Sequence, residues 1–125
     1  MKNDIRTNYN VAMMANVAAT DTTVDVAAIN GAEYGSASFV ALAGTIGTSI
    51  TGKIQFTDDP PTEEQTYTDA VDPRNTAETA VDGSSSRFDV VVFEKQYARL
   101  LLTAVGICSG ITVVTVAGPK RSVQI

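Results

Sequence analysis

The residues with the greatest chemical potential are the carboxylates of residues 58–82. This segment contains one basic residue, Arg74, and eight acidic ones: Asp58, Asp59, Glu63, Glu64, Asp69, Asp72, Glu78 and Asp82. A hard cation such as Ca²⁺ needs several oxygen ligands converging on one point, which the two acidic pairs could supply. The spacing of an EF-hand loop is absent, however, and a run of carboxylates usually forms a solvated loop. We therefore predict an exposed loop without a metal site or cofactor.

Catalysis is restricted most by the absence of histidine from the sequence. Without it, a Ser-His-Asp triad, a Cys-His dyad and an imidazole zinc site are impossible. Glycoside hydrolysis needs two carboxyl groups that face each other across a cleft, and no such pair is evident. Gly44-Thr45-Ile46-Gly47 and the glycines at 31 and 35 lack the Gly-Lys-Ser/Thr ending of a phosphate loop. We expect no enzyme, and no catalytic or cofactor-binding residues.

The single cysteine, Cys108, excludes an internal disulfide framework. It lies in an apolar stretch, whereas reactive thiolates need an accessible, electropositive setting. We therefore interpret it as a buried structural thiol.

Four aromatic residues, Tyr34, Phe39, Tyr67 and Tyr97, could form a platform on which a sugar stacks. Isolated aromatics on strands are more often core or interface residues, and this is the interpretation that we favour.

The composition indicates a globular chain with an acidic balance. The 125 residues are 44% hydrophobic and 18% charged, with nine basic against fourteen acidic side chains and a net charge of −5. Nucleic acids bind through Lys and Arg, so we expect no nucleic-acid partner. The first residues lack the apolar region of a signal peptide, which makes a reducing cytoplasm the expected place of synthesis.

Strand patterns recur at short intervals and no amphipathic helix of three turns is evident. Residues 50–57 alternate clearly, with Ile50, Gly52, Ile54 and Phe56 on one face. Residues 11–19 read as an extended segment that ends in a turn at 20–23. The other expected strands are residues 23–29, 36–43, 65–71, 87–93, 97–105 and 111–117. These patterns predict an all-β fold, a two-sheet antiparallel sandwich that is jelly-roll-like. Residues 11–125 would form the single domain, and residues 1–10 a mobile N-terminal arm.

Residues 100–119 carry no charge and are long enough for a transmembrane helix. Gly106, Ser109, Gly110 and Gly118 interrupt the stretch, and Thr and Val dominate between them. We therefore predict a hairpin of two strands, buried on both faces, with its turn at residues 106–110, and no membrane association.

Several short motifs occur in an order and spacing similar to those of one known protein family. Residues 34–46 (YGSASFVALAGTI) are similar to a Ser-Ala strand that leads into an Ala-Gly-Thr turn. Residues 53–59 (KIQFTDD) resemble that family's Lys-Leu-Gln-Glu-Ser-Asp-Asp strand end. Three further segments match in order: residues 67–71 (YTDAV), residues 97–103 (YARLLLT) with Gly106 and Gly110 after them, and residues 118–121 (GPKR). Together these segments resemble the small head proteins of tailed bacteriophages. The family pattern is not followed at Lys95-Gln96 or at Pro60-Pro61, which affects loop contacts more than the fold.

The resemblance implies a virion structural protein, a capsid decoration (cement) protein that binds the capsid exterior and clamps neighbouring subunits. Its partners would be the major capsid protein and copies of itself in a dimer or trimer at a symmetry axis. Two other functions stay open: another virion component, such as a tail or head-completion protein, and a carbohydrate-binding β-sandwich.

Overall fold

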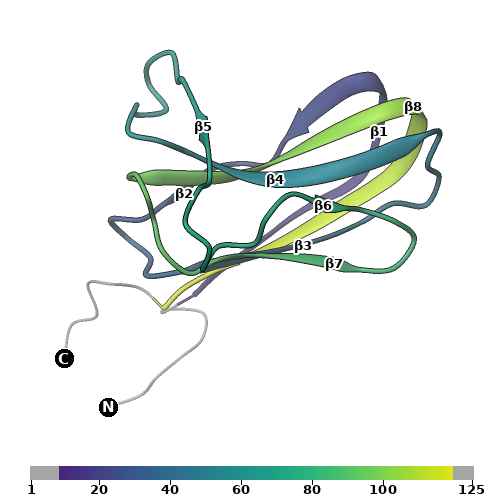
Figure 1. The fold of residues 1–125 in the computed structure, drawn as a ribbon. Coiled ribbons are helices and arrows are strands. Elements are labelled where there is room, and N and C mark those ends of the chain that lie inside the picture. Colours follow the sequence, from purple (N-terminus) through teal and green to yellow (C-terminus); the bar gives the residue numbers. More distant parts are fainter. Residues whose placement is uncertain (1–8, 120–125) are drawn as a thin grey trace.

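The computed structural model describes residues 9–119, which contain strands and no helix (Figure 1). The expected all-β class is confirmed. The eight strands are β1 (Asn10–Asp25), β2 (Ile29–Asn30), β3 (Ala37–Leu42), β4 (Ser49–Thr57), β5 (Thr68–Asp69), β6 (Thr79–Ala80), β7 (Ser86–Val90) and β8 (Tyr97–Ala117). The mobile arm was expected at residues 1–10; residues 1–8 lie outside the described residues, and Asn10 is the first residue of β1. No helix in residues 9–119 could cross a membrane.

Strand β8 is the centre of the sheet. Its first half pairs antiparallel with β4, from Tyr97 opposite Thr57 to Val105 opposite Ser49. Its second half pairs with β3, from Thr112 opposite Leu42 to Ala117 opposite Ala37. β7 extends the sheet beyond β3. The predicted hairpin at 100–117 is therefore wrong, because the two halves of β8 do not pair with each other.

The glycines that suggested a turn instead bend β8. Gly106 and Gly110 have φ values of +81° and +66°, in the left-handed region that favours glycine. Strand β1 follows the same bend along the other edge of β8, with positive φ at Asn16 and Asp21. The Gly106 amide donates a hydrogen bond of 2.7 Å to the Asp21 carboxylate, which joins the two bends. The predicted turn at 20–23 is therefore also wrong: β1 continues through it.

The bent strands curl one antiparallel sheet into a half-barrel. Figure 1 shows β4 and the first half of β8 above β3, β7 and the second half of β8. All eight strands belong to this one hydrogen-bonded sheet. The antiparallel prediction is confirmed, whereas two separate sheets and jelly-roll connections are not.

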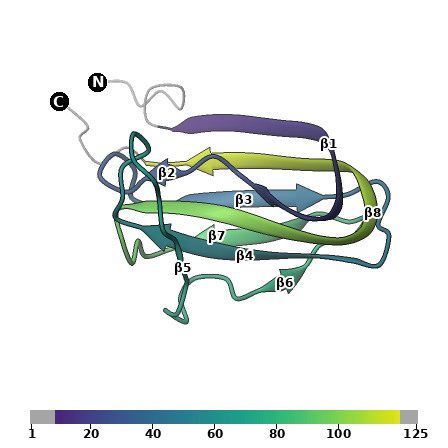
Figure 2. The same cartoon turned by 90° about the horizontal axis from the view of Figure 1, so that it is seen from above.

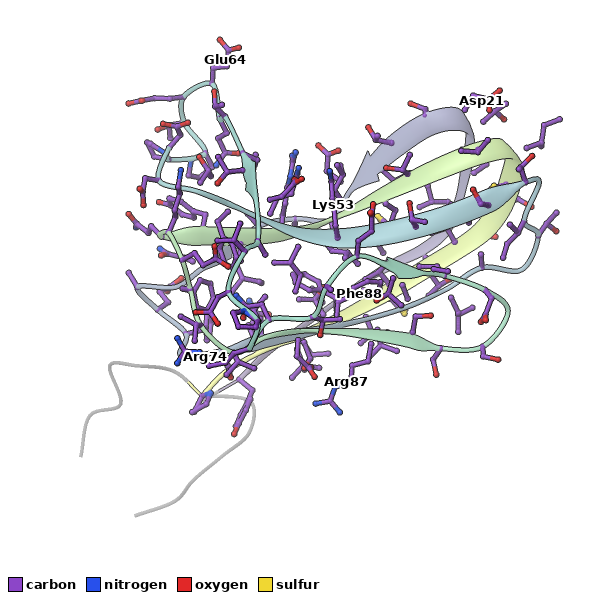
Figure 3. All side chains as sticks on the ribbon, viewed as in Figure 1. Asp21, Lys53, Glu64, Arg74, Arg87 and Phe88 are labelled. Atoms are coloured by element: carbon purple, nitrogen blue, oxygen red, sulfur yellow. The ribbon has the colours of Figure 1, made fainter. Side chains whose placement is uncertain are left out.

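The core fills the space between the two walls of the half-barrel. Its largest fully buried side chains are Phe39, Phe56, Phe88, Ile50, Ile54, Leu100, Leu102 and Ile111. Figure 3 shows Phe88 pointing between the walls and its neighbour Arg87 pointing outward. The apolar face predicted for β4 is confirmed. β8 is buried on one face only, since Leu101 and Val114 on its other face are half-buried.

Candidate functional site

Three of the four tyrosines gather around one cavity. Tyr34, Tyr67 and Tyr97 line a cleft of about 570 Å³, together with Asp25 and Arg99. We call this cavity the tyrosine cleft. It lies where the end of β1, the segment before β5 and the start of β8 meet. Of the four aromatics considered as a stacking platform, Phe39 is instead fully buried in the core.

A tight turn holds Tyr34 at the cleft. The Tyr34 amide donates to the Asn30 carbonyl at 3.1 Å, and the Ala32 amide donates to the Asn30 side-chain oxygen at 2.9 Å. Gly31 is needed in this turn because a Cβ there would lie 2.5 Å from the Phe93 ring. The chain thus turns at Asn30-Gly31, a residue pair that is typical of tight turns.

Arg99 is the central polar group of the cleft. Its guanidinium lies over the Tyr67 ring, with Cζ 3.6 Å from the ring centroid, a cation–π contact. Its Nε and Nη2 donate to the Gln55 Oε1 at 3.1 and 2.9 Å, and Nη1 donates to an Asp25 oxygen at 3.3 Å. Burial raises the pKa of Tyr67, a change that the nearby Arg99 charge partly opposes. Arg99 is therefore fixed on three sides.

Behind Arg99, the network continues through Gln55 to Asp69. The Gln55 side-chain nitrogen Nε2 donates to one Asp69 oxygen at 2.9 Å, and Lys53 Nζ donates to the other at 3.1 Å. These two hydrogen bonds, that of Gln55 first, hold the pKa of Asp69 below its usual range. The sequence reasoning missed Arg99, Gln55 and Asp25 as site residues. The only local signal was a charged residue within an apolar strand.

Much of the acidic segment is held in place by its own carboxylates. The Asp59 carboxylate accepts hydrogen bonds from the Thr66 amide at 2.8 Å and the Thr57 hydroxyl at 3.2 Å. The Asp58 carboxylate accepts one from the Gln96 amide at 3.0 Å. Glu64 points outward at the tip of this loop (Figure 3). Within residues 9–119, no group of three or more Cys, Asp or Glu side chains is placed to hold a metal ion.

The second half of this segment covers the free edge of β7. Asn75 is buried, and its Oδ1 accepts hydrogen bonds from the Val91 and Val92 amides at 2.8 and 3.0 Å. The Thr76 amide donates to the Asp89 carbonyl at 3.1 Å. β5 and β6 cover the outer edge of β4 in the same way. The loop expected from the composition therefore protects two edges of the sheet.

Within this loop, Arg74 donates from Nε and Nη2 to the two Asp72 oxygens at 3.0 and 2.8 Å. These hydrogen bonds, with one from the Arg74 amide, lower the pKa of Asp72 to about 2. A depressed pKa stabilises the fold above the unfolded-state value of about 3.9, and this contribution is lost as the pH falls toward the folded value. We expect Arg74→Ala to raise the Asp72 pKa in a carboxyl NMR titration.

Arg87→Ala serves as the control, because Arg87 pairs with Asp89 and not with Asp72. An Asp72 pKa that is the same in wild type and in Arg74→Ala would contradict the assignment.

Within residues 9–119, strand β1 is an edge strand of the sheet. Among the described residues it pairs only with β8, along one side. In Figure 2 its first half forms the margin of the molecule. Residues 10–20 carry no charge and no proline. Residues 10–14 pair with β8 without a register shift, and an edge segment without Lys, Pro, a bulge or a cover is a template for pairing with another strand.

The surface next to this edge is apolar. Val11 lies opposite Val116, and Met13 lies opposite Val114, which in turn lies opposite Val40 of β3. Residues opposite each other in an antiparallel pair share a face of the sheet. Val11 and Met13 are 62% and 69% exposed, and the other three are half-buried. We call these five residues the outer apolar face.

Cys108 is buried, as expected, and lies 1% exposed in the bend of β8. Its sulfur accepts a hydrogen bond from the Gly47 amide at 3.4 Å. The thiol therefore packs within the fold.

Sequence comparison finds no matching family model and no matching curated protein. Structural comparison finds similar folds. The exported PBSX protein XepA superposes with a TM-score of 0.63 at 16% identity, over 93% of this chain and 39% of XepA. This chain therefore corresponds to well under half of XepA. A protein described under "Bacillus endospore appendages form a novel family of disulfide-linked pili" superposes with a TM-score of 0.52 at 16% identity, over 90% of this chain and 88% of the other. At this identity the likeness concerns the fold.

Proposed function

We propose that this chain is a structural protein of a phage virion that binds other protein surfaces. More specifically, we propose that it is a capsid decoration (cement) protein on the capsid exterior and that its partner is the major capsid protein. The observation that carries it is the uncovered β1 edge beside the outer apolar face. The head-protein resemblance, which covers about residues 20–121, suggests the major capsid protein as that partner. We also propose that the protein is synthesised in the host cytoplasm and that it catalyses no reaction.

The β1 edge pairs with β1 of a second copy. Two antiparallel copies of one strand are related by a two-fold axis, so the contact closes into a dimer and leaves no free edge. Each chain carries a net charge of −5, but residues 10–20 contain no charged side chain. Two paired β1 strands therefore place no like charges opposite each other at these residues. Two outer apolar faces then adjoin across the axis.

The two adjoining outer apolar faces bind the outer surface of the capsid. A standard protein interface buries about 800 Å² on each partner, and several such contacts on one shell reinforce one another through effective concentration. The fold is shared with a protein described as forming pili, which supports a role in assembly. A cement protein bridges adjacent subunits, so its full site exists only on the assembled capsid.

The test mixes the purified protein with undecorated capsids and, separately, with free capsid subunits, and compares co-sedimentation. We expect binding to capsids and little to free subunits. Equal binding to both, or none to either, would remove the cement role.

A variant pair tests the surface. Met13→Lys places a charge on the outer apolar face beside the β1 edge, whereas Val71→Lys places it on an 84% exposed valine in the β5–β6 loop. We expect Met13→Lys to be monomeric in sedimentation equilibrium and to lose capsid binding, and Val71→Lys to behave as wild type. The β1 interface is wrong if both variants retain the dimer.

A further inference from the structure

We infer that the tyrosine cleft binds a neutral oligosaccharide. This inference does not rest on the proposed assembly function: the cleft and the outer apolar face share no residue, and of the β1 edge at residues 10–20 only Asn10 lines the cleft.

The rings of three tyrosines converge on the cleft. Tyr34, Tyr67 and Tyr97 come from three segments far apart in the sequence, and each is half-buried at one cavity. A core would bury such rings fully, as it does Phe39, Phe56 and Phe88. Half-buried rings present an apolar face with a polar hydroxyl, and the C–H faces of sugar rings stack on such surfaces. The volume of about 570 Å³ lies within the range of small-molecule sites.

The cleft is lined by both hydrogen-bond donors and hydrogen-bond acceptors. It is lined by Arg99 and Gln65, whose side chains carry hydrogen-bond donors, and by Asp25, Glu33 and Asn30, whose side chains carry acceptors. An anion entering the cleft would meet Asp25 and Glu33, and a cation would meet Arg99. A sugar hydroxyl both donates and accepts, so an uncharged polyol satisfies both signs of group without repulsion.

Side chains that line the cleft are held rigidly. Arg99 is held by Gln55, Asp25 and the Tyr67 ring, and Tyr34 is held by the Asn30 turn. A site fixed before binding pays less conformational entropy when the ligand arrives. The hydrogen-bond network from Lys53 to Asp25 therefore preorganises the cleft.

The experiment begins with an array of neutral, N-acetylated, sialylated and sulfated oligosaccharides. The best-binding glycan is then titrated while tyrosine fluorescence is recorded. The chain has no tryptophan and only four tyrosines, so the signal reports mainly on the cleft. We expect saturable binding of neutral or N-acetylated glycans. An array without binding, or with binding of sialylated or sulfated glycans alone, would overturn the inference.

Three variants locate the site. Tyr97→Ala and Tyr34→Ala each remove a ring, and each should weaken glycan binding by about tenfold or more, which corresponds to the loss of one stacking contact with its buried area. The matched control is Tyr9→Ala, because Tyr9 lies outside the cleft against Gly118. Glycan binding that Tyr9→Ala reduces as much as the cleft variants would contradict the site.

Two further measurements separate a loss of glycan binding from a loss of folding and from a loss of capsid binding. Tyr97→Phe retains the ring and the fold, so it should keep most of the affinity even if Tyr97→Ala fails to fold. The cleft variants should still co-sediment with capsids as wild type does, so failure of glycan binding and failure of the cement role are distinguishable. A Tyr97→Phe protein that loses binding as completely as Tyr34→Ala would exclude stacking as the basis of recognition.

Discussion

Replacement of Phe88 by alanine is expected to lower the free energy of unfolding by about 3–5 kcal/mol, the range for a fully buried phenylalanine. Phe88 is 0% exposed and lies opposite Phe39 across the β3–β7 pair. Its ring also reaches the facing wall of the half-barrel, where a Cβ on Gly52 of β4 would lie 2.6 Å from Phe88 Cζ. The side chain thus joins the two walls, and its removal leaves a cavity that neither wall can close alone.

The measurement is equilibrium unfolding in denaturant, with the neighbouring Arg87→Ala as control. Arg87 makes an exposed pair with Asp89 on the same strand, and such pairs contribute about 0–1 kcal/mol. A Phe88→Ala protein as stable as Arg87→Ala would show that the walls do not pack through this ring.

Replacement of Gly106 by valine is expected to cost about 2 kcal/mol or more, since a left-handed residue with a branched side chain is strained and a clash adds to the strain. Gly106 has a φ of +81°, and a Cβ there would lie 2.8 Å from the Thr48 backbone nitrogen. The bend of β8 at this position allows one strand to pair with β4 and then with β3. The substitution therefore opposes the curl of the whole sheet.

Gly83→Val is the matched control, because a Cβ at Gly83 meets no atom within 4 Å. Thermal unfolding of both variants checks the difference. Equal melting temperatures for the two variants would mean that the bend does not depend on glycine.

The strands were predictable where burial alternates along the chain. Residues 50–57 bury Ile50, Ile54 and Phe56 on the face that the sequence pattern indicated. Strand period is a local property, since successive side chains point to opposite faces of any sheet. The same reasoning missed the short strands β5 and β6 in their observed extents, because two-residue pairings leave no periodic pattern.

Local sequence signals were not sufficient at residues 100–117, where a hairpin was predicted and one bent strand is found. Gly106 and Gly110 with positive φ fit either a hairpin turn or a bend within one strand. The choice depends on which strands pair with the two halves of β8, and β4, β3 and β1 lie far away in the sequence. The unpredicted bend at Asp21 follows from this pairing, because its carboxylate binds the Gly106 amide.

By itself, the sequence determined the all-β class, the exclusion of histidine chemistry, the burial of Cys108 and the inward face of β4. Each of these depends on residue type or on a period of two, which any strand imposes on its own residues. Only the tertiary structure decided the half-barrel, the uncovered edge of β1 and the convergence of Tyr34, Tyr67 and Tyr97 on Arg99. These features depend on backbone hydrogen bonds between distant segments, and every strand carries the same donors and acceptors, so no single segment specifies its partner.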